Sequence, residues 1–176
     1  MPSLVGSEMC IRDSSNDEQT AYLADGSSGL VIVDISTPAT PGLIGTYNSA
    51  GSAYGLAISS DEQTAYVADY TNGLVIVDIS TPGTPSLIGT YNGVASTINV
   101  VVSSDEQIAY VTDFFNGLII VDISTPGTPT SMGSFDTAGQ AWGLSLSSDG
   151  ESAFVADGAN GLVIIDVSTP SAPISK

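Results

Sequence analysis

The sequence predicts an all-β protein, a β-propeller fragment built from four-stranded antiparallel blades. One observation is a repeat of 44 residues, which is marked by Asp34, Asp78, Asp122 and Asp166. Another is that every unit holds four short segments rich in Val, Ile, Tyr and Thr, which favour strands, and shows no helical period. Four strands in a unit of this length are typical of a propeller blade.

The second unit shows how each strand is predicted. Its β-prone segments are Tyr54–Ser59, Thr64–Asp69, Leu74–Ser80 and Leu87–Tyr91. The third segment begins Leu-Val-Ile-Val and is apolar on both faces, which suits a strand covered on both sides. Stacked blades provide that environment, because each sheet packs between its two neighbours.

Turn sequences separate these segments. Ser60–Gln63 predicts a tight hairpin turn in which the Asp61 carboxylate accepts a hydrogen bond from the nearby backbone. Asp69–Gly73 predicts a longer hairpin turn, because Asn and Gly tolerate the positive φ that closure needs. In Ser80–Pro85 the prolines remove backbone donors and end one strand before the next begins.

Residues 1–14 match nothing in the repeat and resemble a translated sequencing adapter, so we expect this segment to be non-native. The alternative is a native leader, but the segment has neither the basic start nor the apolar core of a secretory signal. The repeat occupies residues 15–176, in units 15–58, 59–102, 103–146 and 147–176. The first unit lacks an inner strand in this interpretation, and the last stops before a full outer strand. We therefore expect two complete and two incomplete blades, from a longer metagenomic reading frame.

The charge of the chain excludes several kinds of partner and site. It contains 19 acidic residues, 2 basic residues and no histidine, for a net charge of −17. Nucleic acid and anionic membrane surfaces both attract clusters of Lys and Arg, so we expect neither as a partner. With no histidine, and with Cys10 as the only cysteine, the usual zinc sites and His-assisted nucleophiles are excluded.

Residues 73–80 read Gly-Leu-Val-Ile-Val-Asp-Ile-Ser and follow Tyr-Val-Ala-Asp at 66–69. This pattern resembles the LVIVD repeat of bacterial and archaeal surface propellers. Close copies stand at 29–36, 117–124 and 161–168, so the resemblance covers essentially all of residues 15–176. It implies an exported protein, extracellular or at the cell surface, without an assigned activity.

Function is expected on the face of the propeller where the loops differ between units. The second hairpin turns and the blade-to-blade connections vary, whereas the first hairpin turns and the Ser-Thr-Pro turns are nearly identical. In an up-down-up-down blade the two variable loops emerge on the same face, and loops on a rigid scaffold commonly carry recognition. The candidate ligand-contact residues are Tyr70, Phe114, Phe115, Tyr54, Trp142 and Asn99.

These candidates have two interpretations. The aromatic rings would form stacking platforms for a sugar or a peptide. Alternatively, Tyr54 and Trp142 wedge between blades while the rings at the turn tips pack on neighbouring turns. Asn99 stands where other units have glycine, and it would line the central channel.

Four aspartates end the second strands and point toward the same face: Asp25, Asp69, Asp113 and Asp157. Carboxylates suit calcium, which takes about six to eight oxygen ligands. One aspartate per blade leaves these side chains too far apart to share an ion, so we expect each to cap its own turn. No cofactor is therefore expected, and calcium is the one candidate that these residues offer.

The sequence favours a non-catalytic binding, adhesion or scaffold module whose ligand is a protein or a glycan. The alternative is a fragment of a calcium-dependent propeller hydrolase or lyase whose active-site blades are missing, and a third interpretation is a structural spacer. Because this segment lacks His and any unit-specific polar cluster on an inner strand, we expect no enzyme here. An open arc leaves apolar faces uncovered, so we expect contact with the remaining blades of the same propeller, or self-association.

Overall fold

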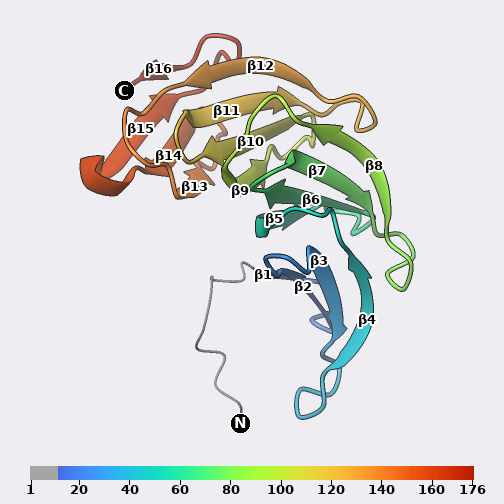
Figure 1. The fold of residues 1–176 in the computed structure, drawn as a ribbon. Coiled ribbons are helices and arrows are strands. Elements are labelled where there is room, and N and C mark those ends of the chain that lie inside the picture. The colour runs from blue at the N-terminus through green and yellow to red at the C-terminus, as the bar shows by residue number, and fades with distance from the viewer. Residues whose placement is uncertain (1–11) are drawn as a thin grey trace.

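Four antiparallel sheets of four strands make up the fold, and each sheet is one propeller blade (Figure 1). The structure is a computed structural model that describes residues 12–176. The first blade consists of β1 (Arg12–Ser14), β2 (Thr20–Ala24), β3 (Leu30–Asp34) and β4 (Gly42–Tyr47). The second consists of β5 (Ala53–Ile58), β6 (Thr64–Asp69), β7 (Gly73–Asp78) and β8 (Ser86–Tyr91). The third consists of β9 (Thr97–Val102), β10 (Ile108–Asp113), β11 (Gly117–Asp122) and β12 (Thr130–Phe135). The fourth consists of β13 (Gly143–Leu146), β14 (Ser152–Ala156), β15 (Leu162–Asp166) and β16 (Ile174–Ser175), with a 3₁₀ turn at Gly158–Asn160.

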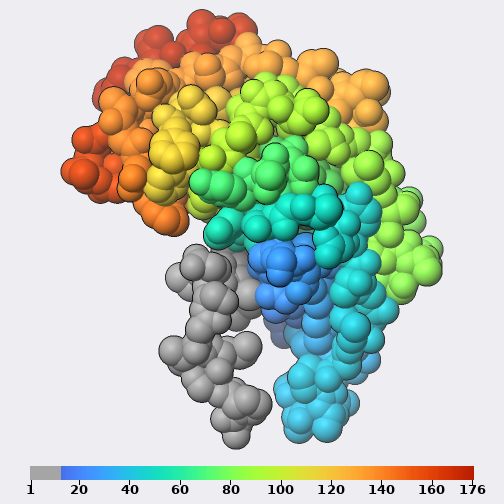
Figure 2. Space-filling view, in the orientation of Figure 1, coloured from blue at the N-terminus to red at the C-terminus, as the bar shows by residue number. Residues whose placement is uncertain are grey.

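The blades stand side by side along an open arc. Within each sheet the strands follow chain order, so the first strand lies on the inner side and the fourth on the outer side (Figure 1). The inner strand β9 lies between β5 and β13. Figure 2 shows the first blade, in blue, and the fourth, in red, at opposite ends of the arc. The expected all-β architecture of four-stranded antiparallel blades is confirmed.

The two end blades are incomplete in the length of their edge strands. β1 has three residues and β16 has two, whereas β5 and β8 of the second blade have six each. The expectation that the first blade has no inner strand is wrong, because Arg12–Ser14 pair with Ala21–Leu23 as β1. Residues 1–11 of the expected non-native segment lie outside the described residues, and its origin stays a prediction.

The core lies between the blades, because the third strand of each blade is apolar on both faces as predicted. In the second blade, the first five residues of β7 are all buried. Alternate side chains of β3 point toward the second blade, where Leu30 and Ile32 pack in one cluster with Val75 and Val77 of β7. The same arrangement recurs between the second and third blades and between the third and fourth. Side-chain alternation therefore stacks one blade on the next.

Two joints fasten neighbouring blades outside this core. At the outer rim, a Cβ built on Gly45 of β4 would lie 2.2 Å from the Pro82 carbonyl oxygen of the second blade, so only glycine fits. Gly89 makes the same approach to Pro126 in the third blade. At the first hairpin turns, Glu62 Oε1 accepts a hydrogen bond of 2.6 Å from the backbone N–H of the preceding blade's turn. The glycine joint therefore occurs between all three neighbouring pairs of blades, and the carboxylate joint between the first and second and between the second and third.

Candidate functional site

The structure brings the two variable sets of loops together on one face. These loops are the second hairpin turns (25–29, 69–73, 113–117 and 157–161) and the blade connections (48–53, 92–97 and 136–141), and we call their surface the variable face. The backbone N–H of Tyr70 donates to Ser52 O at 2.8 Å, and that of Phe114 donates to Ser96 O at 2.9 Å. The hairpin turns of the second and third blades are thus bonded to the connections that lead into their own blades.

The predicted aromatic residues form two separate groups on the variable face. Tyr54 contacts Tyr70, with ring centroids 5.6 Å apart. Phe114 contacts both Phe115 and Trp142 edge to face, at centroid distances of 4.8 and 4.9 Å. Trp142 directly follows the connection into the fourth blade and precedes β13, so the second group spans two blades. Phe115 is 62% exposed and Trp142 is 48% exposed, which makes this group the accessible apolar patch of the face.

Asn99 lies on the inner strand β9, where it pairs with Thr112 of β10. Its Oδ1 accepts a hydrogen bond of 2.8 Å from its neighbour Val100. A Cβ on Gly55 of β5 would lie 2.9 Å from the Asn99 Cα, so glycine allows these two inner strands to approach. The Asn99 side chain donates no hydrogen bond to another described residue, and the residue is half-buried.

Buried carboxylates hold the variable loops in place. Asp69 and Asp157 are each 0% exposed. The Ser49 hydroxyl of the blade connection donates to Asp69 Oδ2, and Thr137, at the matching position, donates to Asp157 Oδ1 at 2.6 Å. Asp69 Oδ1 also accepts from the backbone N–H of Asn72 at 3.1 Å, as expected for a turn cap. These hydroxyl partners were not predicted, although Ser and Thr recurring 88 positions apart beside a variable loop were the available signal.

The third blade departs from this pattern. Asp113 Oδ1 accepts from Phe115 N at 3.0 Å and from Asn116, but its buried Oδ2 has no hydrogen-bond partner among the described residues. Gly93 stands where the other two connections supply a hydroxyl. A cavity of about 330 Å³, lined by Gly93, Val94 and Asn116 among others, opens beside this connection. Among residues 12–176, this unpaired buried carboxylate oxygen occurs in the third blade alone.

A larger cavity of about 530 Å³ lies between the third and fourth blades, at the first hairpin turns. Gly150 occupies the position of Glu62 and Glu106 there, so the carboxylate that bridges the earlier turns is missing. Asp105 lines this cavity and is engaged by its own turn. The Ser103 hydroxyl and the Gln107 backbone N–H lower the pKa of Asp105 by stabilising its charged form.

No group of three or more His, Cys, Asp or Glu side chains among residues 12–176 is arranged to hold a metal ion. The aspartates of the variable face instead accept hydrogen bonds from backbone N–H groups and hydroxyls. Calcium therefore has no assigned position in this part of the chain.

Comparisons with known proteins agree with the fold. The model of the LVIVD repeat family matches residues 18–49, 50–93, 96–137 and 138–176. No curated protein matches the chain. Among solved structures, the periplasmic gluconolactonase of Pseudomonas aeruginosa is 15% identical with a TM-score of 0.75, over 94% of this chain and 55% of that one. A candidate 6-phosphogluconolactonase of Bacteroides uniformis is 14% identical with a TM-score of 0.81, over 99% of this chain and 56% of that one. The hydrazine synthase of Kuenenia stuttgartiensis is 17% identical with a TM-score of 0.73, over 99% and 52%.

These likenesses correct two expectations. The chain resembles propellers named as lactonases, so the expectation of a non-catalytic binding or adhesion module is wrong, and so is the expectation of no enzyme. That expectation rested on missing His and polar clusters, but the chain spans only about half the length of the solved structures it matches.

No helix among residues 12–176 is long and apolar enough to span a membrane. The family model matches a segment in each of the four blades, and each segment contains one copy of the strand that carries the repeat's name, at 30–34, 74–78, 118–122 and 162–166. The chain therefore belongs to the LVIVD repeat family.

Proposed function

We propose that this chain forms four blades of a propeller hydrolase that opens a sugar lactone. The observation that carries the proposal is the likeness, over 94% and 99% of the chain, to a gluconolactonase and to a candidate 6-phosphogluconolactonase. In such a reaction water adds to the lactone carbonyl carbon, the ring C–O bond breaks, and the ring oxygen takes up a proton. We assign substrate contact, and no catalytic step, to the residues of this chain.

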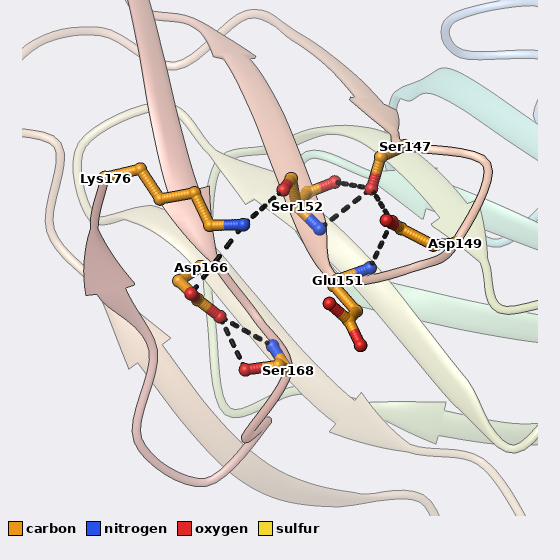
Figure 3. A network of polar contacts seen from close by, with 7 residues as sticks. All are labelled: Ser147, Asp149, Glu151, Ser152, Asp166, Ser168 and Lys176. Atoms are coloured by element: carbon orange, nitrogen blue, oxygen red, sulfur yellow. Dashed lines mark hydrogen bonds and ion pairs between the residues drawn. The ribbon is translucent and has the colours of Figure 1, made fainter.

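The charge of the chain favours an unphosphorylated lactone as substrate. Phosphate groups are usually bound by Arg or Lys, and the sequence has only 2 basic residues against 19 acidic ones. Lys176 is engaged, because its Nζ lies 3.7 Å from Asp166 Oδ2 and donates to Ser152 Oγ at 2.6 Å (Figure 3). The Asp166 carboxylate is fixed in turn by Ser168, whose hydroxyl donates to it at 2.6 Å. A neutral ring therefore suits these four blades better than a sugar phosphate.

The exposed aromatic group of the variable face is the proposed contact surface for the sugar ring. Ligand sites are commonly lined by aromatic side chains with a few polar groups that set orientation. Phe115 and Trp142 offer accessible ring surface, and Phe114 holds Trp142 edge to face. Asn99 offers an amide donor for a hydroxyl or carbonyl oxygen of the substrate. Tyr54 and Tyr70 form a second, half-buried surface of the same kind.

A titration of acid release tests the proposal. We expect the protein to hydrolyse gluconolactone faster than buffer alone, in proportion to protein concentration, and to act more slowly on the 6-phosphorylated lactone. Trp142→Ala should raise KM about tenfold, since the loss of one aromatic contact of about 1.4 kcal/mol corresponds to that factor. Leu87→Ala, at a residue 52% exposed on the outer strand β8, is the control and should leave KM unchanged. A folded protein that releases no acid above the buffer rate contradicts the proposed activity.

We also propose that the protein is exported. The support is the family resemblance to surface propellers and the likeness to the periplasmic gluconolactonase of Pseudomonas aeruginosa. Fractionation of cells that express the complete reading frame tests this location, and recovery in the cytoplasm alone contradicts it.

A further inference from the structure

The fourth blade leaves exposed an apolar face that is buried in each of the first three blades. On β15, Leu162 is 63% exposed and Ile164 is 36% exposed. The matching side chains of the first three blades are at most 1% exposed: Leu30, Ile32, Leu74, Ile76, Leu118 and Ile120. No strand among residues 12–176 covers the β14–β15 face, which ends the arc (Figure 1).

The first blade presents the complementary face at the other end of the arc. In the second blade, Val67, Val75 and Val77 receive the Leu and Ile of the preceding blade and are at most 2% exposed. The same positions of the first blade hold Leu23, Val31 and Val33, which are only half-buried. The first and fourth blades thus carry the two halves of an interface that occurs three times within the chain.

We infer that two copies of this chain associate head to tail, with the β14–β15 face of each copy packed on the β2–β3 face of the other. No strand of residues 12–176 covers either face. Each new contact would reproduce an interface already present in one copy. One copy covers 52–56% of the propellers it resembles, so two copies supply enough chain for a closed ring. Twice four blades also falls within the range of about four to eight blades of known propellers. A head-to-tail contact that closes gives a discrete assembly rather than a fibre.

A polar contact at the first hairpin turns sets the direction of this association. Inside the chain, Glu106 Oε1 accepts from Ser60 N at 2.6 Å, just as Glu62 Oε1 accepts from the first blade's turn. Glu18 occupies the same turn position in the first blade, with the same left-handed backbone (φ 57° against 56° for Glu106). Its carboxylate accepts no hydrogen bond from another described residue, and Ser148 of the fourth blade matches Ser60. In the pair, Glu18 of one copy would accept from the backbone N–H of Ser148 in the other.

Charge acts against the pair and gives it a salt dependence. Each copy carries a net charge of −17, so the two copies repel one another at low ionic strength. Added salt screens this repulsion and leaves the apolar contact in place. We therefore expect association to strengthen as salt is raised, the opposite of a contact held by ion pairs.

Light scattering coupled to size exclusion measures the association directly. We expect about twice the chain mass of 17.8 kDa for the protein as it stands, and a single-copy mass for Leu162→Glu. Leu87→Glu places the same charge on another exposed leucine (52% against 63% for Leu162) outside both faces, and it should leave the double mass unchanged. Circular dichroism should be identical for all three proteins. A single-copy mass for the parent protein would overturn the inference and would indicate that further blades of a longer chain cover the face. A continuous series of larger masses, or a double mass that persists in Leu162→Glu, would also overturn it.

Crosslinking tests the orientation independently. In a Cys10→Ser background, Glu18→Cys together with Ser148→Cys should give a two-copy product with a short bismaleimide. The matched pair Glu106→Cys with Ser60→Cys should crosslink within one copy, because those two positions are already bonded inside the chain. A two-copy mass with no crosslink from the first pair would place the contact elsewhere and sink the head-to-tail arrangement.

Discussion

Replacing Thr137 by valine removes one hydroxyl and nearly preserves the shape of the side chain. That hydroxyl donates to Asp157 Oδ1 at 2.6 Å, and the two residues are 7% and 0% exposed. The substitution leaves a buried carboxylate oxygen without this donor, which water cannot readily replace. An unsatisfied buried polar group costs about 1–3 kcal/mol, and a charged acceptor lies toward the upper part of that range. We expect a loss of about 2 kcal/mol in the free energy of unfolding.

Thermal and urea unfolding measure this loss. For a chain of this length, about 1 kcal/mol shifts Tm by roughly 2–4 °C, so Thr137→Val should lower Tm by about 4–8 °C. Thr46→Val, on an exposed position of β4, is the control and should stay within about 0.5 kcal/mol of the parent. If Thr137→Val and Thr46→Val have the same Tm and the same free energy of unfolding, the Thr137 hydroxyl does not hold the Asp157 carboxylate. The account of how the variable loops are fixed would then be wrong.

Three further predictions follow from the described contacts. Asp113→Asn should leave the free energy of unfolding unchanged or raise it, because it removes a buried charge whose Oδ2 lacks a hydrogen-bond donor. Asp69→Asn should lower it by about 1–2 kcal/mol in urea titrations, because Asp69 Oδ2 accepts from the Ser49 hydroxyl. Equal losses in the two variants would contradict this prediction. Gly89→Ala should destabilise the protein by about 1–3 kcal/mol, because the added Cβ would lie 2.2 Å from a carbonyl oxygen. Gly42→Ala is the control and should not destabilise it, because the space around Gly42 is open. Unchanged stability of Gly89→Ala would show that the backbone at the rim joint shifts to admit the methyl group. The aspartates of the first hairpin turns that accept a hydrogen bond from serine have lowered pKa values. Their contribution to the free energy of unfolding is therefore present above the unfolded pKa of 3.8 and is lost as pH falls through the folded pKa. Ser103→Ala should make the fall of Tm below pH 4 less steep, and an unchanged dependence of Tm on pH in that range would contradict this.

The repeat determines most of the fold, because every unit restates the same local chemistry. Thr64–Asp69 is predicted residue for residue, since alternation and the turn signals at both ends agree. The next strand was predicted to reach Ser80 but ends at Asp78, because the Asp78 carboxylate accepts from the Ser80 N–H at 2.9 Å and turns the chain. Such a capping bond depends on backbone geometry that strand propensity does not describe.

The site was less predictable because it depends on contacts between units. Trp142 and Phe114 come from different blades, so no pattern within one unit indicates that their rings meet edge to face. The unpaired Oδ2 of Asp113 arises only because Gly93 replaces a hydroxyl, a difference that reads as ordinary loop variation in the sequence. The likeness to structures named as lactonases could not be predicted from any residue, because it comes from the shape of the whole arc.

The rim joint between Gly45 and Pro82 has a consequence for how such a gene can change. The first three units each encode the glycine of the joint that follows, and the second, third and fourth units each encode the proline of the joint that precedes. Unequal recombination between two copies of the repeat, at any matching point, adds or deletes a whole 44-residue unit and leaves every glycine opposite a proline. An insertion of any other length separates the two halves at one rim. Copy number can therefore drift in this lineage while the repeat length stays constant.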